Sequence, residues 1–395
     1  MMKKCFKLMV ALVLALSLMA ALLISVGGAE SVSPIYSADD LFTSRDFKQE
    51  ADLTDAVTYV LSDGQDIHIT AAGVYVLTGT AKNATVYVEA GKDDKVQIVL
   101  DGVNVTNADF PVIYAKTADK VFITTSADSA LTVTGAFAAD GGTNTDGVIF
   151  SKCDLTLNGT ATLTISSQDN GIVGKDDLKV TGGTYVITAS SKAIQTNDSI
   201  RIADGDFTLV AGTDGLHAEN EDDDTLGYIY IGGGSFTIQA GDDGIHATSV
   251  AQIDGGTLSI KAPEGIEATF VQINGGTINI QSTDDGINAA QKSRSYTATV
   301  EINGGDITIS MGAGDTDGVD SNGNIIVNGG TLRVTGNSTF DYDGTAQYNG
   351  GTIIVNGQQV SSIPNQMMGG MGGRNGMTGT GGANGGWGSS GGRGR

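Results

Sequence analysis

Cysteine, proline, aromatic residues and positive charge are all scarce in this sequence. Among 395 residues there are two cysteines, four prolines and 6% aromatics. Cys5 lies in the N-terminal hydrophobic segment and Cys153 stands alone, which excludes a framework of intramolecular disulfides. Only 22 basic side chains face 45 acidic ones, so the formal net charge is −23. Such a field repels nucleic acid and anionic lipid and attracts cations, so we expect no nucleic-acid partner.

Glycine, in contrast, is abundant, with 58 residues and no G-X-Y period. That frequency predicts many tight turns between short strands. Apolar segments such as Val74–Leu77 and Val96–Leu100 are short and of β type, and no run shows the apolar spacing of a long helix. Because 40% of the residues are hydrophobic, the chain can bury a large core. The composition therefore predicts a folded all-β protein.

The first thirty residues have the features of an export signal. Lys3 and Lys4 precede an apolar run from Leu8 to Val26, and residues 27–29 (Gly-Gly-Ala) form a small-residue cleavage site. We therefore expect residues 1–29 to be a signal peptide and the protein to be secreted or at the cell surface. The run is also long enough to span a bilayer, so an uncleaved anchor is the alternative.

Two short patterns alternate along most of the chain. The first is apolar-x-apolar-(Asn/Asp/Gly)-Gly-Gly, as in Ile253–Gly256 and Ile273–Gly276, and the second is an acid-Gly-apolar turn. Successive turns are 21 to 32 residues apart. Two or three short strands per repeat, each ended by glycine, are typical of one coil of a parallel β-helix, in which every strand pairs with its equivalent one coil on.

The repeats predict the organisation of the whole chain. We expect a single-stranded parallel β-helix of about a dozen coils over residues 57–360, preceded by a spacer at 30–56. Its inward side chains should form ladders, such as Leu216, Ile245, Ile266, Ile287 and Val319. Residues 361–395 are rich in glycine and methionine and cannot build a core, so we expect a disordered tail there.

The acid before glycine is the most informative position for function. If the coils stack, five such acids lie one above another, and further acids crowd beside them. The candidate ligands are Asp214, Asp242, Asp243, Glu264, Asp284, Asp285, Asp315 and Asp317. Two carboxylates about 5 Å apart repel by about 3 kcal/mol at an effective dielectric constant near 20. Oxygen ligands without a cysteine cage suit Ca²⁺. The alternative is that Asp-Gly serves only as a turn dipeptide.

Four basic side chains are further candidates for the site. His217 and His246 occupy equivalent places on successive coils and should point outward, as a metal or sugar contact or as plain turn residues. Lys192 falls where neighbouring coils carry an acid, so it should face Asp214 as a counter-charge or act as a Brønsted base. Lys175 is a second, similar candidate.

Several segments together resemble a known family. Gly73–Gly79, Lys95–Gly102, Lys152–Gly159 and Gly171–Leu178, in this order, resemble a family of secreted bacterial carbohydrate-binding β-helix proteins, and the match runs over residues 60–355. That family is similar in fold to the family-nine pectate lyases. The resemblance implies a right-handed β-helix that binds acidic polysaccharide with calcium, usually without cleavage. The lyases pair their calcium-binding aspartates with a lysine base, which the resemblance does not locate here.

Three functions are therefore compatible with the sequence. The first hypothesis is an exported, monomeric, non-catalytic protein that binds a polygalacturonate-like polysaccharide through calcium. The second is a calcium-dependent pectate lyase acting by β-elimination, with Lys192 or Lys175 as the base. The third is a structural or adhesive solenoid at the cell surface.

Overall fold

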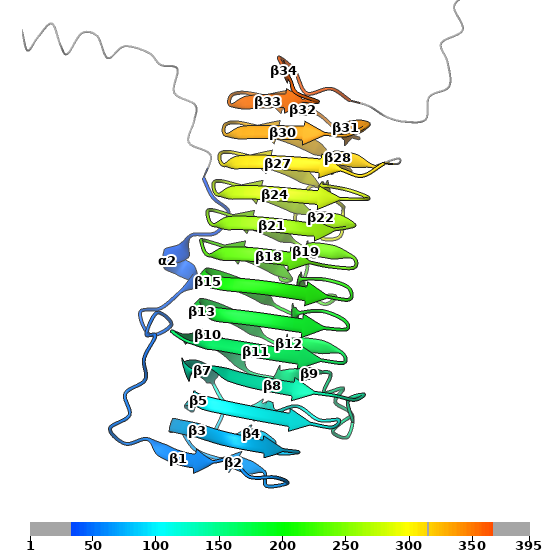
Figure 1. Cartoon of the computed structure of the whole chain (residues 1–395). Helices are drawn as coiled ribbons and strands as arrows, with labels where there is room; N and C mark the ends of the chain where they lie inside the picture. Colours follow the sequence, from blue (N-terminus) through cyan, green and yellow to red (C-terminus); the bar gives the residue numbers. More distant parts are fainter. Residues whose placement is uncertain (1–32, 314–315, 366–395) are drawn as a thin grey trace, which may run out of the picture.

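The protein is a solenoid of short strands stacked along one axis (Figure 1). The computed structural model describes residues 33–313 and 316–365. In these ranges it contains 34 strands, β1 to β34, and the short helix α2 (Ala38–Leu41). The strands form one sheet of 12 and one of 22. Neighbouring strands within each sheet pair in parallel, except for the last two strands, β33 and β34, which are antiparallel. The predicted all-β, parallel β-helix fold is thereby confirmed.

The 12-stranded sheet, called sheet B below, forms one face of the solenoid and contributes one strand to each coil. This number agrees with the dozen coils predicted. Its strands are β2 (Ile67–Ile69), β4 (Val86–Glu89), β6 (Ile113–Thr117), β9 (Gly147–Ser151), β12 (Asn170–Gly174), β14 (Ile194–Thr196), β16 (Leu216–Ala218), β19 (Asp243–Ala247), β22 (Glu264–Ala268), β25 (Ile287–Ala289), β28 (Asp317–Ser321) and β31 (Ser338–Tyr342).

The 22-stranded sheet covers the remaining faces in two rows. Four strands bend through both rows: β3 (Gly73–Lys82), β5 (Lys95–Asn107), β13 (Asp177–Ala189) and β15 (Ser199–Ala211). The other strands of the first row are β1 (Val57–Val60), β7 (Lys120–Ala127), β10 (Asp154–Gly159), β17 (Tyr228–Ile231), β20 (Val250–Ile253), β23 (Phe270–Ile273), β26 (Thr299–Ile302), β29 (Asn324–Val327) and β32 (Ala346–Tyr348). Those of the second row are β8 (Ser129–Val133), β11 (Thr162–Ser167), β18 (Ser235–Gln239), β21 (Thr257–Ala262), β24 (Thr277–Ser282), β27 (Asp306–Met311), β30 (Thr331–Thr335), β33 (Thr352–Val355) and β34 (Gln358–Val360).

Ladders of identical or similar side chains fill the interior. The predicted ladder from Leu216 to Val319 is in register and fully buried, and Cys153 also lies in the core. Coils approach so closely at the start of the sheet B strands that only glycine fits. A Cβ on Gly244 would lie 2.6 Å from the carbonyl oxygen of Gly265 and would also meet the side chain of Ile260. The acid-Gly repeat is thus a packing requirement as well as a turn.

The segment expected to be a spacer is packed on the solenoid (Figure 1). Leu41 and Phe42 pack against Tyr228 and Tyr230 of β17. The carboxylate of Asp46, with 0% exposure, lies 2.8 Å from Nζ of Lys120. Residues 33–49 are therefore part of the folded body, which sequence patterns could not show because their partners lie far along the chain.

The two terminal predictions concern parts of the chain that are not described here. The signal peptide at 1–29 lies outside the described residues, as do residues 366–395 of the expected tail. Within the described ranges, no helix is long and apolar enough to cross a membrane.

Candidate functional site

Two parallel rows of polar side chains run along the outer surface of sheet B. The first row consists of the acids that precede glycine: Asp214, Asp243, Glu264, Asp285 and Asp317. The second row lies three residues further along each coil and consists of His217, His246, Glu267, Asn288, Asp320 and Asp341, which are paired in register. The predicted stacking of the acids is therefore correct, and the second row adds charges that change along the axis.

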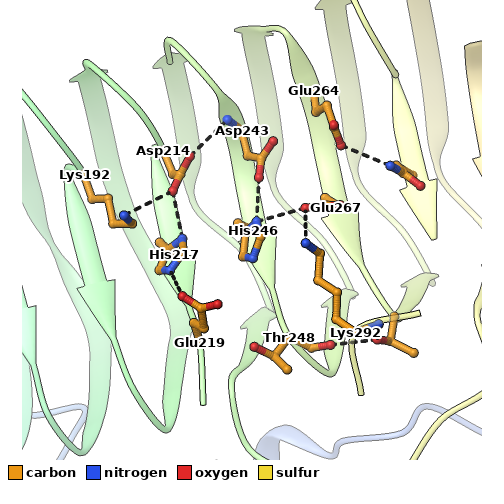
Figure 2. A network of polar contacts seen from close by, with 12 residues as sticks. Lys192, Asp214, His217, Glu219, Asp243, His246, Thr248, Glu264, Glu267 and Lys292 are labelled. Atoms are coloured by element: carbon orange, nitrogen blue, oxygen red, sulfur yellow. Dashed lines mark hydrogen bonds and ion pairs between the residues drawn. The ribbon is translucent and has the colours of Figure 1, made fainter. Parts of the chain in front are cut away.

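The first part of this face neutralises its acids internally (Figure 2). Asp214 lies 2.8 Å from Nδ1 of His217 and 3.8 Å from Nζ of Lys192. The other ring nitrogen of His217 contacts Glu219 at 3.2 Å. Burial alone would raise the pKa of Asp214, but the hydrogen bond with the ring of His217 holds it below its usual range. Lys192 thus faces Asp214, as predicted.

The next coils repeat this arrangement with an additional acid. Nδ1 of His246 lies 2.5 Å from Asp243 and 3.0 Å from Glu267, and Nζ of Lys292 lies 3.0 Å from Glu267 (Figure 2). Burial opposes charging of the ring, but the two carboxylates raise the pKa of His246 to about 9. His246 is therefore a cation at neutral pH.

The predicted outward position of the two histidines needs a correction in one respect. Their rings stack at 4.6 Å on the outer surface of sheet B, yet His217 and His246 are only 5% and 9% exposed. Neighbouring carboxylates cover them, so neither is an exposed turn residue.

Further along the face, the second row continues with Asn288, Asp320 and Asp341 in place of the histidines. Glu264 accepts a hydrogen bond of 3.2 Å from the amide of Asn288. Burial and the carboxylates of Glu267 and Asp243 raise the pKa of Glu264 to about 8. The face changes here from paired charges to unbalanced negative charge.

A hollow of about 360 Å³ follows at the C-terminal end of sheet B and is lined by oxygen ligands. Its lining residues are Asp284, Asp285, Asp317, Asp320, Asn322, Asp341 and Asp343. Burial, with the charges of Asp320 and Asp284, raises the pKa of Asp285 to about 7. Burial, with the charges of Asp317 and Asp341, raises the pKa of Asp320 to about 6. Bare carboxylates in this hollow therefore repel one another strongly. We call it the acidic hollow.

Among the described residues, two groups of side chains have the geometry to hold a metal ion. Oxygens of Asp317, Asp320 and Asp341 lie within 4.8 Å of one another, as do ligand atoms of Asp243, His246 and Glu267. In the second group, the ring of His246 already holds a proton between two carboxylates, which opposes a cation. In the first group one buried oxygen of Asp341 has no hydrogen-bond partner. The acidic hollow therefore fits a hard cation better.

The structure brings together some of the predicted ligands and separates others. Asp284, Asp285 and Asp317 meet in the acidic hollow, whereas Asp214, Asp243 and Glu264 lie in the earlier coils. Asp242 is exposed and lines neither metal-like group. Asp315 lies outside the described residues.

The base candidate Lys175 follows β12, two strands before β16, where the first row of acids begins. Its Nζ lies 5.7 Å from the ring of Phe150.

Sequence reasoning missed several members of the face, among them Glu267, Lys292 and Asp320. Glu267 and Asp320 each follow the first-row acid by three residues, in Glu-Gly-Ile-Glu and Asp-Gly-Val-Asp. In a regular strand, residues three apart face opposite sides, but here the acid precedes the strand corner at glycine, and its side chain meets that of the third residue on the outer surface, as the contact of Asp243 with His246 shows. The signal was present at a fixed offset. Lys292 follows β25 in an insert and had no such signal.

Comparisons with known proteins indicate the family of this chain. A family model described as "Carbohydrate-binding domain-containing protein" matches residues 63–318 and 266–362. A protein of Acetivibrio thermocellus with the same description is 32% identical over 185 residues, which are 45% of this chain and 65% of the relative. The match thus spans less than two thirds of that relative's length. A solved structure of a polysaccharide lyase-like protein from C. thermocellum, a gadolinium derivative, aligns with a TM-score of 0.44 and 24% identity. The alignment covers 74% of this chain and 99% of that one. Because the family model covers most of the solenoid, this chain belongs to the family of carbohydrate-binding domain-containing proteins.

Proposed function

We propose that the protein is an exported, non-catalytic binder of acidic polysaccharide that works through calcium held in the acidic hollow. One observation carries the proposal: the hollow combines six aspartates and one asparagine, and two of its carboxyl groups have raised pKa values. A divalent cation would remove this repulsion, and oxygen-only ligands select Ca²⁺ or Mg²⁺. Export supports calcium, because extracellular modules work at millimolar calcium.

Calcium would also explain how so acidic a protein holds an acidic polymer. A chain of net charge −23 repels polygalacturonate unless a cation lies between them. The hollow is open on the outer surface of sheet B, so an ion bound there has ligand positions left for a uronate carboxylate. The stacked coils on either side offer a long surface along which an extended polymer can lie.

The test compares a double variant of the hollow with a control variant outside it. Calcium binding and polygalacturonate binding are measured by isothermal titration calorimetry, the latter with calcium or with chelator. We expect the double variant Asp285→Asn, Asp320→Asn to bind both at least about tenfold more weakly. Asp242→Asn also removes an acid close to the ladder, but its side chain is exposed outside the hollow, so it should bind like the wild type. Equal calcium affinity in all three proteins would refute the site.

Pectate lyase activity is a second candidate, and Lys292 is the observation that favours it. Its Nζ lies 3.0 Å from Glu267, within the group that also contains Asp243 and His246. Lys192, in contrast, belongs to the coil of β14, five strands from β28, or about 24 Å at the usual strand spacing. A base must reach the substrate beside the metal, which Lys192 does not if calcium is in the hollow.

Lyase activity has a direct assay. Incubation of polygalacturonate with protein and calcium should leave the ultraviolet absorbance of unsaturated uronides unchanged if the protein only binds. Formation of these products, and their loss in Lys292→Met but not in Lys192→Met, would favour the enzyme.

A further inference from the structure

A second hollow lies near the N-terminal end of the solenoid, where the chain turns into the first strands of sheet B. It has a volume of about 400 Å³, and its lining includes Asp66, Asn83, Tyr87, Asp109 and Phe110. These residues come from three successive coils, at or just before β2, β4 and β6. The acidic hollow involves β25, β28 and β31, at the other end of the same sheet, so the two sites are separate. We call this one the aromatic hollow.

Aromatic rings form the wall of this hollow. Tyr87 and Phe110 are partly exposed, with ring centroids 6.1 Å apart. Both pack on Tyr114, which is fully buried and in turn contacts Phe150. The two outer rings are thus held in place by a buried aromatic base. Such a rigid apolar wall is suited to the C–H face of a sugar ring, because contact removes apolar area from water with little loss of side-chain entropy.

Polar groups at the rim have hydrogen-bonding capacity left. One oxygen of Asp66 accepts the backbone N–H of Thr85 at 2.9 Å, which leaves its second oxygen. The side-chain oxygen of Asn83 accepts the N–H of Ala108, which leaves the two N–H donors of the same amide for a ligand. Asp109 is exposed. A wall of two rings with carboxylate and amide groups at the rim is typical of preformed sites for small polar ligands.

The backbone of the hollow is fixed in advance. Asn107, which is buried, accepts the N–H of Ala84 at 2.9 Å and donates to the carbonyl oxygens of Ala84 and Pro111. This side chain joins the corners of two adjacent coils. The rings and rim groups therefore keep their spacing without a ligand, which lowers the entropic cost of binding.

The charge around the hollow selects the kind of sugar. Asp66 and Asp109 are acids, the ring of His68 stacks on Tyr87 at 4.9 Å and contacts Glu89, and Nζ of Lys116 lies 4.9 Å from the centroid of Tyr87. This Nζ is already paired with Glu89 and Asp140, each at 3.3 Å. A uronate would meet like charge here without a cation to offset it, whereas a neutral hydroxyl can donate to either carboxylate.

We propose that the aromatic hollow binds one neutral pyranose unit of a polysaccharide, without calcium. The sugar lies against Phe110 and Tyr87, and its hydroxyls donate to Asp66 and Asp109 and accept from Asn83. The protein then has two glycan sites of different chemistry on one face: this one for neutral sugar, and the acidic hollow for calcium-bridged uronate. The inference does not depend on the acidic hollow, since none of its residues is shared.

Affinity gel electrophoresis in chelator tests the proposal with the full chain. The probes are soluble neutral polysaccharides: mixed-linkage β-glucan, xyloglucan, arabinoxylan and galactomannan. We expect at least one of them to retard the wild type. Phe110→Ala should weaken that binding at least about tenfold. The matched control Phe47→Ala removes another ring, 49% exposed on the N-terminal segment, and should bind like the wild type.

A second variant guards against loss of folding in Phe110→Ala. Asp109→Ala changes an exposed rim group only and should weaken the same binding several-fold, whereas Asp101→Ala, an exposed acid on β5, should not. Lack of retardation by every neutral probe would overturn the proposal, as would equal binding by Asp109→Ala and Asp101→Ala. The Asp285→Asn, Asp320→Asn protein should lose calcium-dependent binding of polygalacturonate and should still bind the neutral polysaccharide. This outcome would show that the two sites are distinct.

Discussion

Without divalent cations, we expect the folded protein to become less stable as the pH rises from 5 to 8. The reason lies in three carboxyl groups on sheet B. Their pKa values in the folded state are about 8 for Glu264, about 7 for Asp285 and about 6 for Asp320. In the unfolded chain these acids are far apart and titrate near pH 4. Between these limits the folded state holds more protons than the unfolded state, so its stability falls as the pH increases.

The size of the effect follows from the same values. Raising the pKa of Asp285 from 3.8 to about 7 corresponds to about 4 kcal/mol less stability once the pH exceeds 7. His246 acts in the same direction. Its pKa is raised to about 9, so its stabilising contribution is complete below pH 6.5 and is lost as the pH rises through 9. We expect the melting temperature in chelator to fall by several degrees between pH 5 and pH 8.

Calcium should counteract this loss. An ion that binds only the folded state stabilises it by about 2.7 kcal/mol at a hundredfold excess over its dissociation constant. The assay is the melting temperature, followed by circular dichroism at pH 5, 6, 7 and 8 with chelator or calcium. In Asp285→Asn both the pH dependence and the calcium effect should shrink, and in Asp242→Asn both should persist. A wild-type melting temperature that is unaffected by pH and chelator would refute the reasoning.

Two further predictions concern the scaffold. Asp46→Asn leaves Lys120 without its buried counter-charge, so we expect the free energy of unfolding to fall by about 3 to 5 kcal/mol. Amide hydrogens of residues 38–49 should then exchange faster. Unchanged protection there would contradict the conclusion that this ion pair holds the segment on the solenoid. Gly244→Ala forces a Cβ against Gly265 and should lower stability to urea by about 1 to 3 kcal/mol. Gly142→Ala, with open space around it, serves as the control, and equal midpoints for the two would show that the corner is not tight.

The fold could be predicted because its determinants are local and repeated. Each coil repeats an apolar residue directly after glycine, so the register between Ile245 and Ile266 follows from counting residues. The first row of acids follows from the same count, because Asp243 and Glu264 precede these glycines. A pattern that recurs at fixed offsets predicts both the inner ladder and the outer row.

The remaining features depend on contacts between residues far apart in sequence. The N-terminal segment is fixed by pairs such as Asp46 with Lys120 and Tyr36 with Gln252, which no period reveals. Lys292 reaches Glu267 from an insert between two coils. The sequence therefore predicted where acids stack but not which of them have cations beside them, and that distinction separates the paired part of the face from the acidic hollow.

The difference between the paired part of this face and the acidic hollow can be reduced to one position in each coil. In Asp214-Gly-Leu-His217 and in the next coil, the first-row acid lies 2.8 Å and 2.5 Å from a histidine three residues later. In Asp317-Gly-Val-Asp320 the same position holds a second acid, which lines the acidic hollow. A basic side chain of the protein and a bound metal cation are thus alternative ways to neutralise the same row of acids.

This equivalence leads to the prediction that Asp320→His will exchange bound calcium for an internal cation. The new ring should pair with Asp317, as His217 pairs with Asp214, while the acid that had a pKa of about 6 is removed. That removal alone corresponds to about 3 kcal/mol at neutral pH, so the melting temperature in chelator should rise while the increase caused by calcium shrinks. Asp320→Asn is the control, because it removes the acid without supplying a cation; the histidine variant should be the more stable of the two at pH 6. A full calcium response in Asp320→His, or lower stability than Asp320→Asn in chelator, would show that the two parts of the face are not interchangeable.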